Sequence, residues 1–453
     1  MHMTVGEIVK ACGGKLLCGD PATVVTGVET DSRQIRPGDL FVPLRGERVD
    51  AHVFIPATFE AGAAAVLTQE HATMQAKHAW IAVPDTAKAL QALATAYRRR
   101  FQMPLIGITG SVGKTTTKEM VALALSAGLN VMKTQGNQNS QVGVPLTMFQ
   151  LDASYQAGVI EMGMSQFGEM ARLASIVAPQ YAVMTNIGIS HIENLHTQDN
   201  ILREKLHITD GFGPDSILVL NGEDPMLAGL RGRLPFRTVF VGMQPWCDYR
   251  ATDLVSHDGT MDFTAQCPGM QVPVHLPVLG AHQVTNALAA LAIADILHVD
   301  PQAAAAALAN YQPLAMRQQV HHVDGITIID DTYNASPDAM RSSVDVLCAY
   351  SGRHVAVLGD MLELGAYSEQ AHFSCGEHAA QAGVDLLVTV GPAAAAIGEG
   401  ARSVCPQMAC RHFETNREAA EYLRQALTAG DVVLVKGSRG MHMEEIISRL
   451  ISL

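Results

Sequence analysis

The segment at residues 107–116, with the sequence GITGSVGKTT, restricts the possible folds of this chain more than any other segment. It follows the short apolar run 104–106 and precedes residues 118–126, which we expect to be helical. A strand, a glycine turn, Lys-Thr and a helix make a phosphate-binding loop, in which backbone N–H groups and the positive end of the helix dipole surround an anion. Lys114 adds a cation, and Thr115 offers a hydroxyl to Mg²⁺. The predicted nucleotide contacts are Gly107, Ile108, Thr109, Gly110, Ser111, Val112, Gly113, Lys114, Thr115 and Thr116.

Composition excludes several classes of protein. The formal net charge of −13 argues against a nucleic-acid-binding surface, and the one basic cluster, residues 98–100, is expected to be a solvated linker. The eight cysteines include no C-x-x-C pair, which favours reduced thiols in a cytoplasmic protein. Glu7 and Lys10 argue against a signal peptide, and no apolar run is long enough to span a bilayer. We therefore expect no nucleic-acid partner and no membrane insertion.

The 453 residues are too many for a single core, and the pattern predicts an α/β protein with three domains. Residues 1–100 are expected to form a small mixed α/β N-terminal domain. Strands and helices alternate over residues 101–312, which predicts a central P-loop domain with a mostly parallel sheet. Within it, residues 249–279 alternate like an antiparallel edge, with a hairpin turn at 257–259. Residues 313–453 carry four apolar strands and predict a C-terminal Rossmann-like, doubly wound domain.

Three acidic positions follow apolar strands: Glu161, the pair Asp330 and Asp331, and Asp360. In open α/β sheets ligands bind at the carboxyl ends of the strands, so all three are placed to reach a cleft. Glu161 belongs to the same domain as the phosphate-binding loop and is the best candidate for a metal ligand. The other acids would face the nucleotide only if the C-terminal domain closed over it.

Several further residues allow two interpretations. His191 follows another strand end, so it is either a metal ligand or a structural histidine. Lys205 lies on an expected helix, 199–209, among apolar neighbours, where a lysine usually extends its ammonium to solvent. The amide-rich loop 136–145 could bind ligand oxygens or form a plain turn. Residues 436–440, KGSRG, combine a glycine turn with two cations that suit phosphate or carboxylate.

Together these motifs resemble a known family. The segments ITGSVGKTT, QGNQNSQVGVP, VIEMG, NIGISHIEN, ILREKL, GAHQVTNALAA, DDTYNASPDAM, VLGDMLELG and VKGSRG occur in the order seen in the Mur ligases of peptidoglycan synthesis. The resemblance covers essentially the whole chain, including TDSRQIRPGDLFVPLRGERVDAH near the start. DDTYNASP, GDMLELG and KGSR are most similar to the member that forms the last amide bond. Ile108, at a position where the usual loop has glycine, fits the family's own variant of the loop.

The resemblance implies a role for each of these residues. Lys114, His191 and Lys205 would be catalytic, with Lys205 carbamylated so that it becomes an anionic metal ligand. The implied metal ligands are Thr115, Glu161, His191 and Lys205, and the further ATP contacts are Asn286, Arg317, Asp331 and Tyr333. The implied substrate contacts are Ser32, Arg33, Gly46 and His52 for the uridine nucleotide, with Asn137, Asn139, Asn334, Lys436, Ser438 and Arg439.

The resemblance also implies the reaction. An ATP- and Mg²⁺-dependent amide ligase would activate the carboxylate of UDP-N-acetylmuramoyl-tripeptide as an acyl phosphate, which the amine of D-alanyl-D-alanine then attacks. We expect a monomer whose C-terminal domain swings about Pro313 to close over the central one. A folylpolyglutamate synthase-like ligase is the first alternative, although that enzyme lacks such an N-terminal domain. A nucleotide-switch ATPase is the second, although the N-K-x-D motif that GTPases use to read the base is missing.

Overall fold

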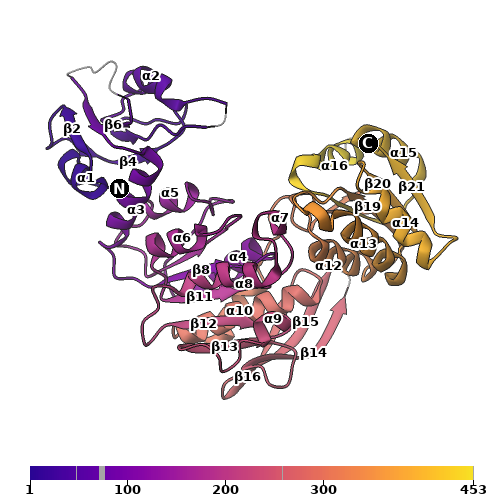
Figure 1. The fold of residues 1–453 in the computed structure, drawn as a ribbon. Helices are drawn as coiled ribbons and strands as arrows, with labels where there is room; N and C mark the ends of the chain where they lie inside the picture. The colour runs from indigo at the N-terminus through magenta and orange to yellow at the C-terminus, as the bar shows by residue number, and fades with distance from the viewer. Residues whose placement is uncertain (47, 71–76, 258, 452–453) are drawn as a thin grey trace.

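The computed structural model describes residues 1–46, 48–70, 77–257 and 259–451. Figure 1 shows a bent row of three domains, with the central domain between an indigo N-terminal domain and a yellow C-terminal domain. Among the described residues, each domain has its own principal sheet, and no principal sheet crosses residue 100 or residue 312. The predicted α/β class with three domains is therefore confirmed.

The N-terminal sheet has the strand order β2-β7-β6-β5-β4, in which β2 runs antiparallel to the other strands. The helix α1 (Val5–Cys12) starts at a capping box between Thr4 and Glu7 and ends at Gly13, which has a φ of 64°. The helix α3 (Thr86–Arg98) leads to the central domain, and α2 (Ile55–Glu60) precedes β6. The strands are β2 (Lys15–Cys18), β4 (Gly27–Glu29), β5 (Asp39–Phe41), β6 (Ala65–Thr68) and β7 (Ala79–Ala82). A separate two-stranded sheet is formed by β1 (Met3–Thr4) and β3 (Val24–Val25).

The central sheet has the strand order β16-β15-β14-β13-β12-β11-β8-β10-β9. Strands from β8 to β14 pair in parallel, whereas β14, β15 and β16 pair antiparallel, which confirms the predicted edge. Asp258, in the predicted hairpin turn, lies outside the described residues. The strands are β8 (Leu105–Thr109), β9 (Val131–Lys133), β10 (Ala157–Glu161), β11 (Tyr181–Met184), β12 (Ile217–Asn221), β13 (Arg237–Gly242), β14 (Tyr249–His257), β15 (Thr260–Cys267) and β16 (Met270–Leu276).

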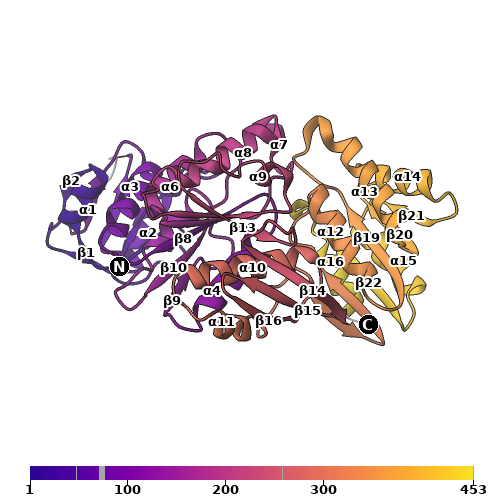
Figure 2. The same ribbon diagram turned by 90° about the horizontal axis from the view of Figure 1, so that it is seen from below.

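Helices cover both faces of the central sheet. One face packs against α4 (Lys114–Leu125), α10 (Ala281–Ile296) and α11 (Pro301–Leu308), and Ile106 and Ile108 of β8 point into this core. The other face packs against α6 (Glu169–Val177) and the segment around α8 (Gln198–Leu206), where Leu105 is buried. Figure 2 shows the strands β14 and β15 reaching toward the C-terminal domain.

The C-terminal sheet has the strand order β17-β18-β22-β19-β20-β21, parallel except for β17. The helices α12 (Pro337–Cys348), α13 (Ser368–Ala382) and α14 (Ala395–Val404) cover one face, and α15 (Asn416–Ala426) and α16 (Glu444–Ile451) cover the other. The strands are β17 (Gln319–Val323), β18 (Ile326–Asp330), β19 (Arg353–Gly359), β20 (Leu386–Val390), β21 (Ala409–Phe413) and β22 (Asp431–Lys436). The sheet confirms the predicted doubly wound domain and adds β17 and β21 at its two edges.

One expectation about the basic cluster was wrong. Arg98 is buried, and its guanidinium donates hydrogen bonds to the carbonyl oxygens of Val177, Phe101 and Met103. Burial lowers the pKa of this guanidinium. Arg98 therefore joins the end of α3 to the central domain instead of lying in a solvated linker.

Two observations concern the whole chain. All eight cysteines lie within the described residues, and Cys247, Cys267 and Cys375 are buried as free thiols. In the part of the chain that the structure describes, no helix combines the length and the apolar character that crossing a membrane requires.

Candidate active site

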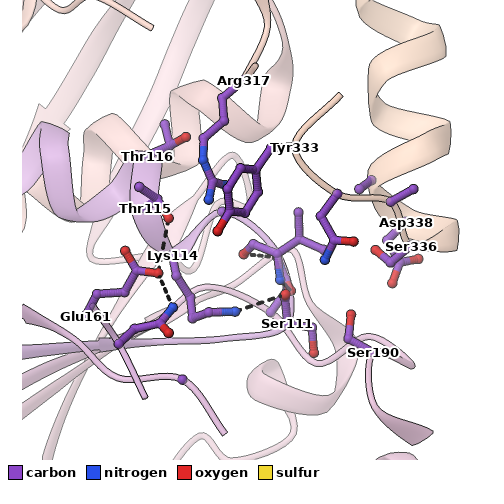
Figure 3. A pocket seen from close by; sticks show the side chains of 18 of the residues that line it. Ser111, Lys114, Thr115, Thr116, Glu161, Ser190, Arg317, Tyr333, Ser336 and Asp338 are labelled. Carbon is purple, nitrogen blue, oxygen red and sulfur yellow. Dashed lines mark hydrogen bonds between the residues drawn. The ribbon is translucent and has the colours of Figure 1, made fainter. Parts of the chain in front are cut away.

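A cavity of about 670 Å³ lies between the central and C-terminal domains. Figure 3 shows residues from both domains facing it. The lining includes Ser111–Thr116 in the phosphate-binding loop and Glu161, Ser190, His191 and Asn286 from the rest of the central domain. The C-terminal contribution includes Arg317, Asp331, Tyr333, Asn334, Ser336, Asp338 and Lys436. Most of the residues predicted for the nucleotide and its phosphates thus share one space.

The phosphate-binding loop owes its shape to two glycines. Gly110 has a φ of 144°, and a Cβ at this position would lie 1.9 Å from Thr185 Oγ1, so no larger residue fits. Gly113 has a φ of 84° and is the N-cap of α4. The helix therefore starts at Lys114, four residues before the predicted start, and its first turn carries the positive end of the helix dipole. Gly107, Ile108 and Thr109 lie in the buried strand β8, behind this surface.

Lys114 folds back over its own loop. Its Nζ donates to the carbonyl oxygens of Gly110 at 2.8 Å and Ser111 at 3.2 Å. Burial lowers the pKa of this ammonium, Glu161 opposes the shift, and Arg317 adds to it. The ammonium is thus held beside the cavity by weak neutral acceptors, which an anionic phosphate would readily replace.

Glu161 and Thr115 fit a divalent cation. Thr115 Oγ1 donates to Glu161 Oε1 at 3.1 Å, and Asn139 Nδ2 donates to the same oxygen at 2.7 Å. Among the described residues, the buried Glu161 Oε2 has no hydrogen-bond partner. A hydroxyl and a carboxylate are oxygen ligands of the kind that Mg²⁺ prefers. Asn139, predicted as a substrate contact, here orients this carboxylate.

The other two implied metal ligands make different contacts. The side chain of Lys205 is buried, so the alternative that its ammonium reaches solvent was wrong, and its Nζ donates to the carbonyl oxygen of Gly110 at 3.0 Å. Burial lowers the pKa of Lys205 well below its ordinary value, and Lys114 adds to the shift. His191, with a φ of 60°, precedes α7 (Ile192–Leu195), and its Nδ1 lies 2.7 Å from Glu363 Oε2 of the C-terminal domain. Within the described chain, no three His, Cys, Asp or Glu side chains gather as a metal site.

The nucleotide contacts predicted in the second half of the chain all line the cavity. The Arg317 guanidinium stacks over the Tyr333 ring, 3.8 Å from its centre. Lys436 Nζ donates to Asp331 Oδ2 at 2.5 Å, and Ser343 Oγ donates to the same oxygen at 2.6 Å. Asn286 Oδ1 accepts a hydrogen bond from Thr117 Oγ1 at 3.0 Å, which fixes this amide at the start of α4.

Other predicted substrate contacts lie outside this cavity. Asn137, Ser438 and Arg439 are not part of the lining formed by the described residues. Ser438 Oγ accepts from the backbone N–H of Leu362, and Arg439 pairs with Glu444.

The predicted uridine contacts are in the N-terminal domain. The exposed Arg33 pairs with Asp31, and the buried His52 ring lies between Asp50 and the backbone N–H of Gln69. A second cavity, of about 390 Å³, lies between this domain and the region from Gln138 to Gln150. Its lining, drawn from the described part of the chain, does not include Ser32, Arg33, Gly46 or His52.

Sequence reasoning missed a buried lysine beside the site. Lys118 is 0% exposed, and its Nζ donates to the carbonyl oxygens of Thr134 at 2.9 Å and Gly136 at 3.2 Å. The same ammonium lies 3.0 Å from Glu119 Oε1 and 3.9 Å from Glu161 Oε2. It thus joins the amide-rich loop to the candidate metal ligand. Its position on α4, one turn after Lys114, was the only sequence signal.

Comparison with known proteins identifies the family. Residues 24–98 match the family model "Mur ligase family, catalytic domain", residues 108–294 match "Mur ligase middle domain", and residues 316–439 match "Mur ligase, glutamate ligase domain". A Bacillus subtilis UDP-N-acetylmuramoyl-tripeptide–D-alanyl-D-alanine ligase is 37% identical over 95% of this chain and 94% of its own length. The chain belongs to the Mur ligase family.

Other relatives of the same name also span the full length. The Escherichia coli protein is 33% identical over 99% of this chain and 98% of its own length. The crystal structure of MurF from Acinetobacter baumannii superposes with a TM-score of 0.93 at 32% identity, covering 100% of this chain and 99% of its own. MurF from Thermotoga maritima, in complex with ADP, gives a TM-score of 0.84 at 29% identity, covering 94% and 97% of the two chains. This Mur ligase is therefore similar to one branch of the family along its whole length.

Proposed function

We propose that this Mur ligase joins D-alanyl-D-alanine to UDP-N-acetylmuramoyl-tripeptide with ATP, in the cytoplasmic synthesis of peptidoglycan precursors. The observation that carries the proposal is the shared cavity, in which the phosphate-binding loop and Glu161 face Arg317, Tyr333 and Lys436 of the next domain. The substrates are those in the name of the full-length relatives from Bacillus subtilis and Escherichia coli. A phosphate site at the junction of two domains suits a reaction that brings three substrates together.

The chemistry has two steps. A carboxylate oxygen of the tripeptide attacks the γ-phosphorus of ATP, ADP leaves, and an acyl phosphate forms. The amine of the dipeptide then attacks the acyl carbon, and inorganic phosphate leaves. Lys114 and the N-terminus of α4 would stabilise the negative charge on the transferred phosphoryl group. Thr115 and Glu161 would hold Mg²⁺, which supplies further charge neutralisation when bound.

The remaining assignments are part of the same proposal. The N-terminal domain, residues 1–100, would bind the uridine nucleotide. The central domain, residues 101–312, would bind ATP, and the C-terminal domain, residues 313–453, would complete the ligase site. Asn286 and Arg317 would contact the nucleotide, and Lys205 would carry a carbamate, since its buried amine favours the neutral form that reacts with carbon dioxide. We also propose that the enzyme acts as a monomer.

The alternative of a folylpolyglutamate synthase-like ligase has less support. The Mycobacterium tuberculosis folylpolyglutamate synthase gives a TM-score of 0.64 at 17% identity and covers 80% of this chain, so the likeness is one of fold. The experiment that tests the proposal is phosphate release from ATP with UDP-N-acetylmuramoyl-tripeptide, with and without D-alanyl-D-alanine. We expect release that depends on both substrates. Hydrolysis that is indifferent to them would overturn the proposal and favour a nucleotide-switch ATPase.

A further inference from the structure

Two carboxylates that line the cavity, Glu169 and Asp338, have no role in the chemistry described above. In the part of the chain that the structure describes, the acidic residues that line the cavity are Glu161, Glu169, Asp331 and Asp338. Glu161 accepts from Thr115 and Asn139, and Asp331 accepts from Lys436 and Ser343. Glu169 accepts from the backbone N–H groups of Ser165 and Gln166. Three of the four carboxylates are therefore already held by groups of the cavity wall.

Asp338 is the least constrained of the four. Its one hydrogen-bonding partner among the described side chains is Arg341, one turn later on the same helix. The two side chains are 46% and 40% exposed, so solvent screens their pairing and a ligand can displace it at little cost. An acid in the first turn of α12 also stabilises the helix through its dipole. That effect does not require the carboxylate to face the cavity.

The position of Asp338 places its charge beside the phosphate-binding loop. A Cβ at Gly188 would lie 2.5 Å from Asp338 Oδ2 and 3.4 Å from Ser111 Cβ. The backbone N–H of Gly188 donates to Ser111 Oγ at 2.9 Å. In Figure 3, Asp338 and Ser190 lie at one end of the cavity, Glu161 and Thr115 lie at the other, and Lys114 and Ser111 lie between them. Asp338 thus reaches the loop from the side opposite the candidate metal ligands.

A second polar group next to Asp338 is unused. Ser336 is the N-cap residue of α12, but its side chain makes no capping hydrogen bond. Ser336 is only 7% exposed and lines the cavity, and its Oγ has no hydrogen-bond partner within the described chain. Buried hydroxyls are usually hydrogen-bonded, so this one indicates a partner that the protein itself does not supply.

The charge around the reacting atoms decides which ligand fits. Lys114, Arg317 and Lys436 face the cavity and suit phosphate, but they repel a cationic substrate. The acceptor dipeptide carries an α-ammonium group, and its nitrogen has to reach a carbon bonded to the transferred phosphate. Asp338, whose pairing with Arg341 is screened by solvent, offers a negative charge at the edge of the phosphate-binding loop, where the nitrogen must arrive.

We propose that Asp338, assisted by the Ser336 hydroxyl, binds the α-amino group of the acceptor dipeptide. This inference rests on the proposed function and names the subsite of its second substrate. The Asp338 carboxylate accepts hydrogen bonds from the ammonium, and the Ser336 oxygen accepts another. The amine is then held at the side of the phosphate-binding loop away from Glu161 and Thr115.

The test uses the full-length variant Asp338→Asn, which keeps the side-chain shape and removes the charge. We expect the KM for D-alanyl-D-alanine to rise by about 10- to 100-fold, the effect of losing a hydrogen bond to a charged group. The KM values for ATP and UDP-N-acetylmuramoyl-tripeptide should stay within about twofold of wild type. Asp345→Asn is the matched control, because Asp345 lies on the same helix but pairs with His378 at the surface.

Two further measurements separate binding of the amine from a structural effect. Acyl phosphate trapped with hydroxylamine in the absence of acceptor should form at the wild-type rate in Asp338→Asn. D-lactyl-D-alanine has a hydroxyl in place of the ammonium. The ratio of its inhibition constant to the KM for D-alanyl-D-alanine should be much larger in the wild type than in Asp338→Asn. Ser336→Ala should raise the same KM by a smaller factor.

The outcomes are distinguishable. An unchanged KM for D-alanyl-D-alanine in Asp338→Asn, or an equal rise for all three substrates, would overturn the amine subsite. Loss of acyl phosphate formation in a variant that melts at the wild-type temperature would also overturn it. A wild-type enzyme that does not use D-alanyl-D-alanine would instead overturn the proposed function.

Discussion

His191 Nδ1 lies 2.7 Å from Glu363 Oε2, and this contact joins residues 172 positions apart in the chain. Both residues have left-handed backbone angles, with φ of 60° at His191 and 62° at Glu363. Beside them, a Cβ at Gly365 would lie 3.5 Å from Glu193, so the segment after β19 packs directly on α7. Non-glycine residues hold such angles only where their surroundings compensate for the strain. The pair therefore marks a specific docking point between the central and C-terminal domains.

The first prediction concerns this docking point. Glu363→Ala removes the acceptor at His191, and we expect the two domains to separate more often in the ligand-free enzyme. The side chains are partly exposed, so the loss should be at most about 1 kcal/mol, or about a fivefold change in the docked population. Small-angle scattering should show a larger radius of gyration for the variant without ligand. The radius should fall to the wild-type value when an ATP analogue and UDP-tripeptide are added.

The same experiment tests the proposed hinge at Pro313. A radius of gyration that saturating ligand leaves unchanged in both proteins, while ligation proceeds, would show that the domains are already docked. Glu421→Ala is a suitable control, since Glu421 pairs with Arg417 on the outer surface of α15.

The second prediction concerns Lys114. Its Nζ contacts two loop carbonyls and no hydrophobic core, so Lys114→Ala should leave the melting temperature within a few degrees of wild type. Turnover should fall by about 10²- to 10³-fold or more, because a cation preorganised for the transferred phosphoryl group is lost. Thermal unfolding checks the first expectation and phosphate release checks the second, each measured beside the exposed variant Lys88→Ala. Near-wild-type ligation by Lys114→Ala would remove the phosphate-binding loop from the mechanism.

Local sequence was enough to predict the phosphate-binding loop and the α/β class. Gly110 and Gly113 need special backbone angles, and the apolar runs that became β8, β10 and β22 are buried on both faces. The start of α4 was placed too late because residues 114–117, KTTT, carry no apolar periodicity. The edge strands β17 and β21 were missed for a related reason, since their half-exposed residues do not form an apolar run.

The parts of the site that sequence could not predict depend on distant partners. Arg98 is buried against Val177, 79 positions away, and nothing in the RRR cluster distinguishes it from its exposed neighbour Arg99. The contact between His191 and Glu363 depends on how two separate domains dock. In the sequence, Asp338 is indistinguishable from any acid in the first turn of a helix. Only the structure shows that its carboxylate lies beside Gly188.

The third prediction concerns the charge on Lys205. Its pKa is lowered in the folded protein, mainly by burial, so the unfolded chain binds this proton more tightly than the folded one. The free energy of unfolding should therefore rise with pH, from the folded pKa up to the ordinary value of about 10.4. Lys205→Met removes this contribution, so its stability should rise less steeply with pH over the same interval. Urea unfolding at a series of pH values in carbon-dioxide-free buffer checks the slope.

The fourth prediction concerns the carbamate itself. With ¹³C-labelled bicarbonate, a carbamate carbon signal should be present in the wild-type enzyme and missing in Lys205→Ala. That variant should lose activity, and a small carboxylic acid that fills the vacated space should restore part of it. An unmodified lysine in crystals grown with nucleotide and magnesium would contradict the adduct.

The last prediction concerns Lys118, whose ammonium contacts the carbonyl oxygens of Thr134 and Gly136 and the carboxylate of Glu119. Lys118→Met leaves these buried acceptors without a cation, so it should lower the free energy of unfolding by about 3–5 kcal/mol. Lys133→Met is the matched control: Lys133 pairs with the same Glu119, but its side chain is 38% exposed, so the loss should stay below about 1 kcal/mol. Urea unfolding measures both variants. Equal losses would show that the ammonium of Lys118 does no more than a surface charge. A loss confined to Lys118→Met, together with a higher Mg²⁺ requirement for ADP binding measured by calorimetry, would show that it holds the amide loop and Glu161 in place.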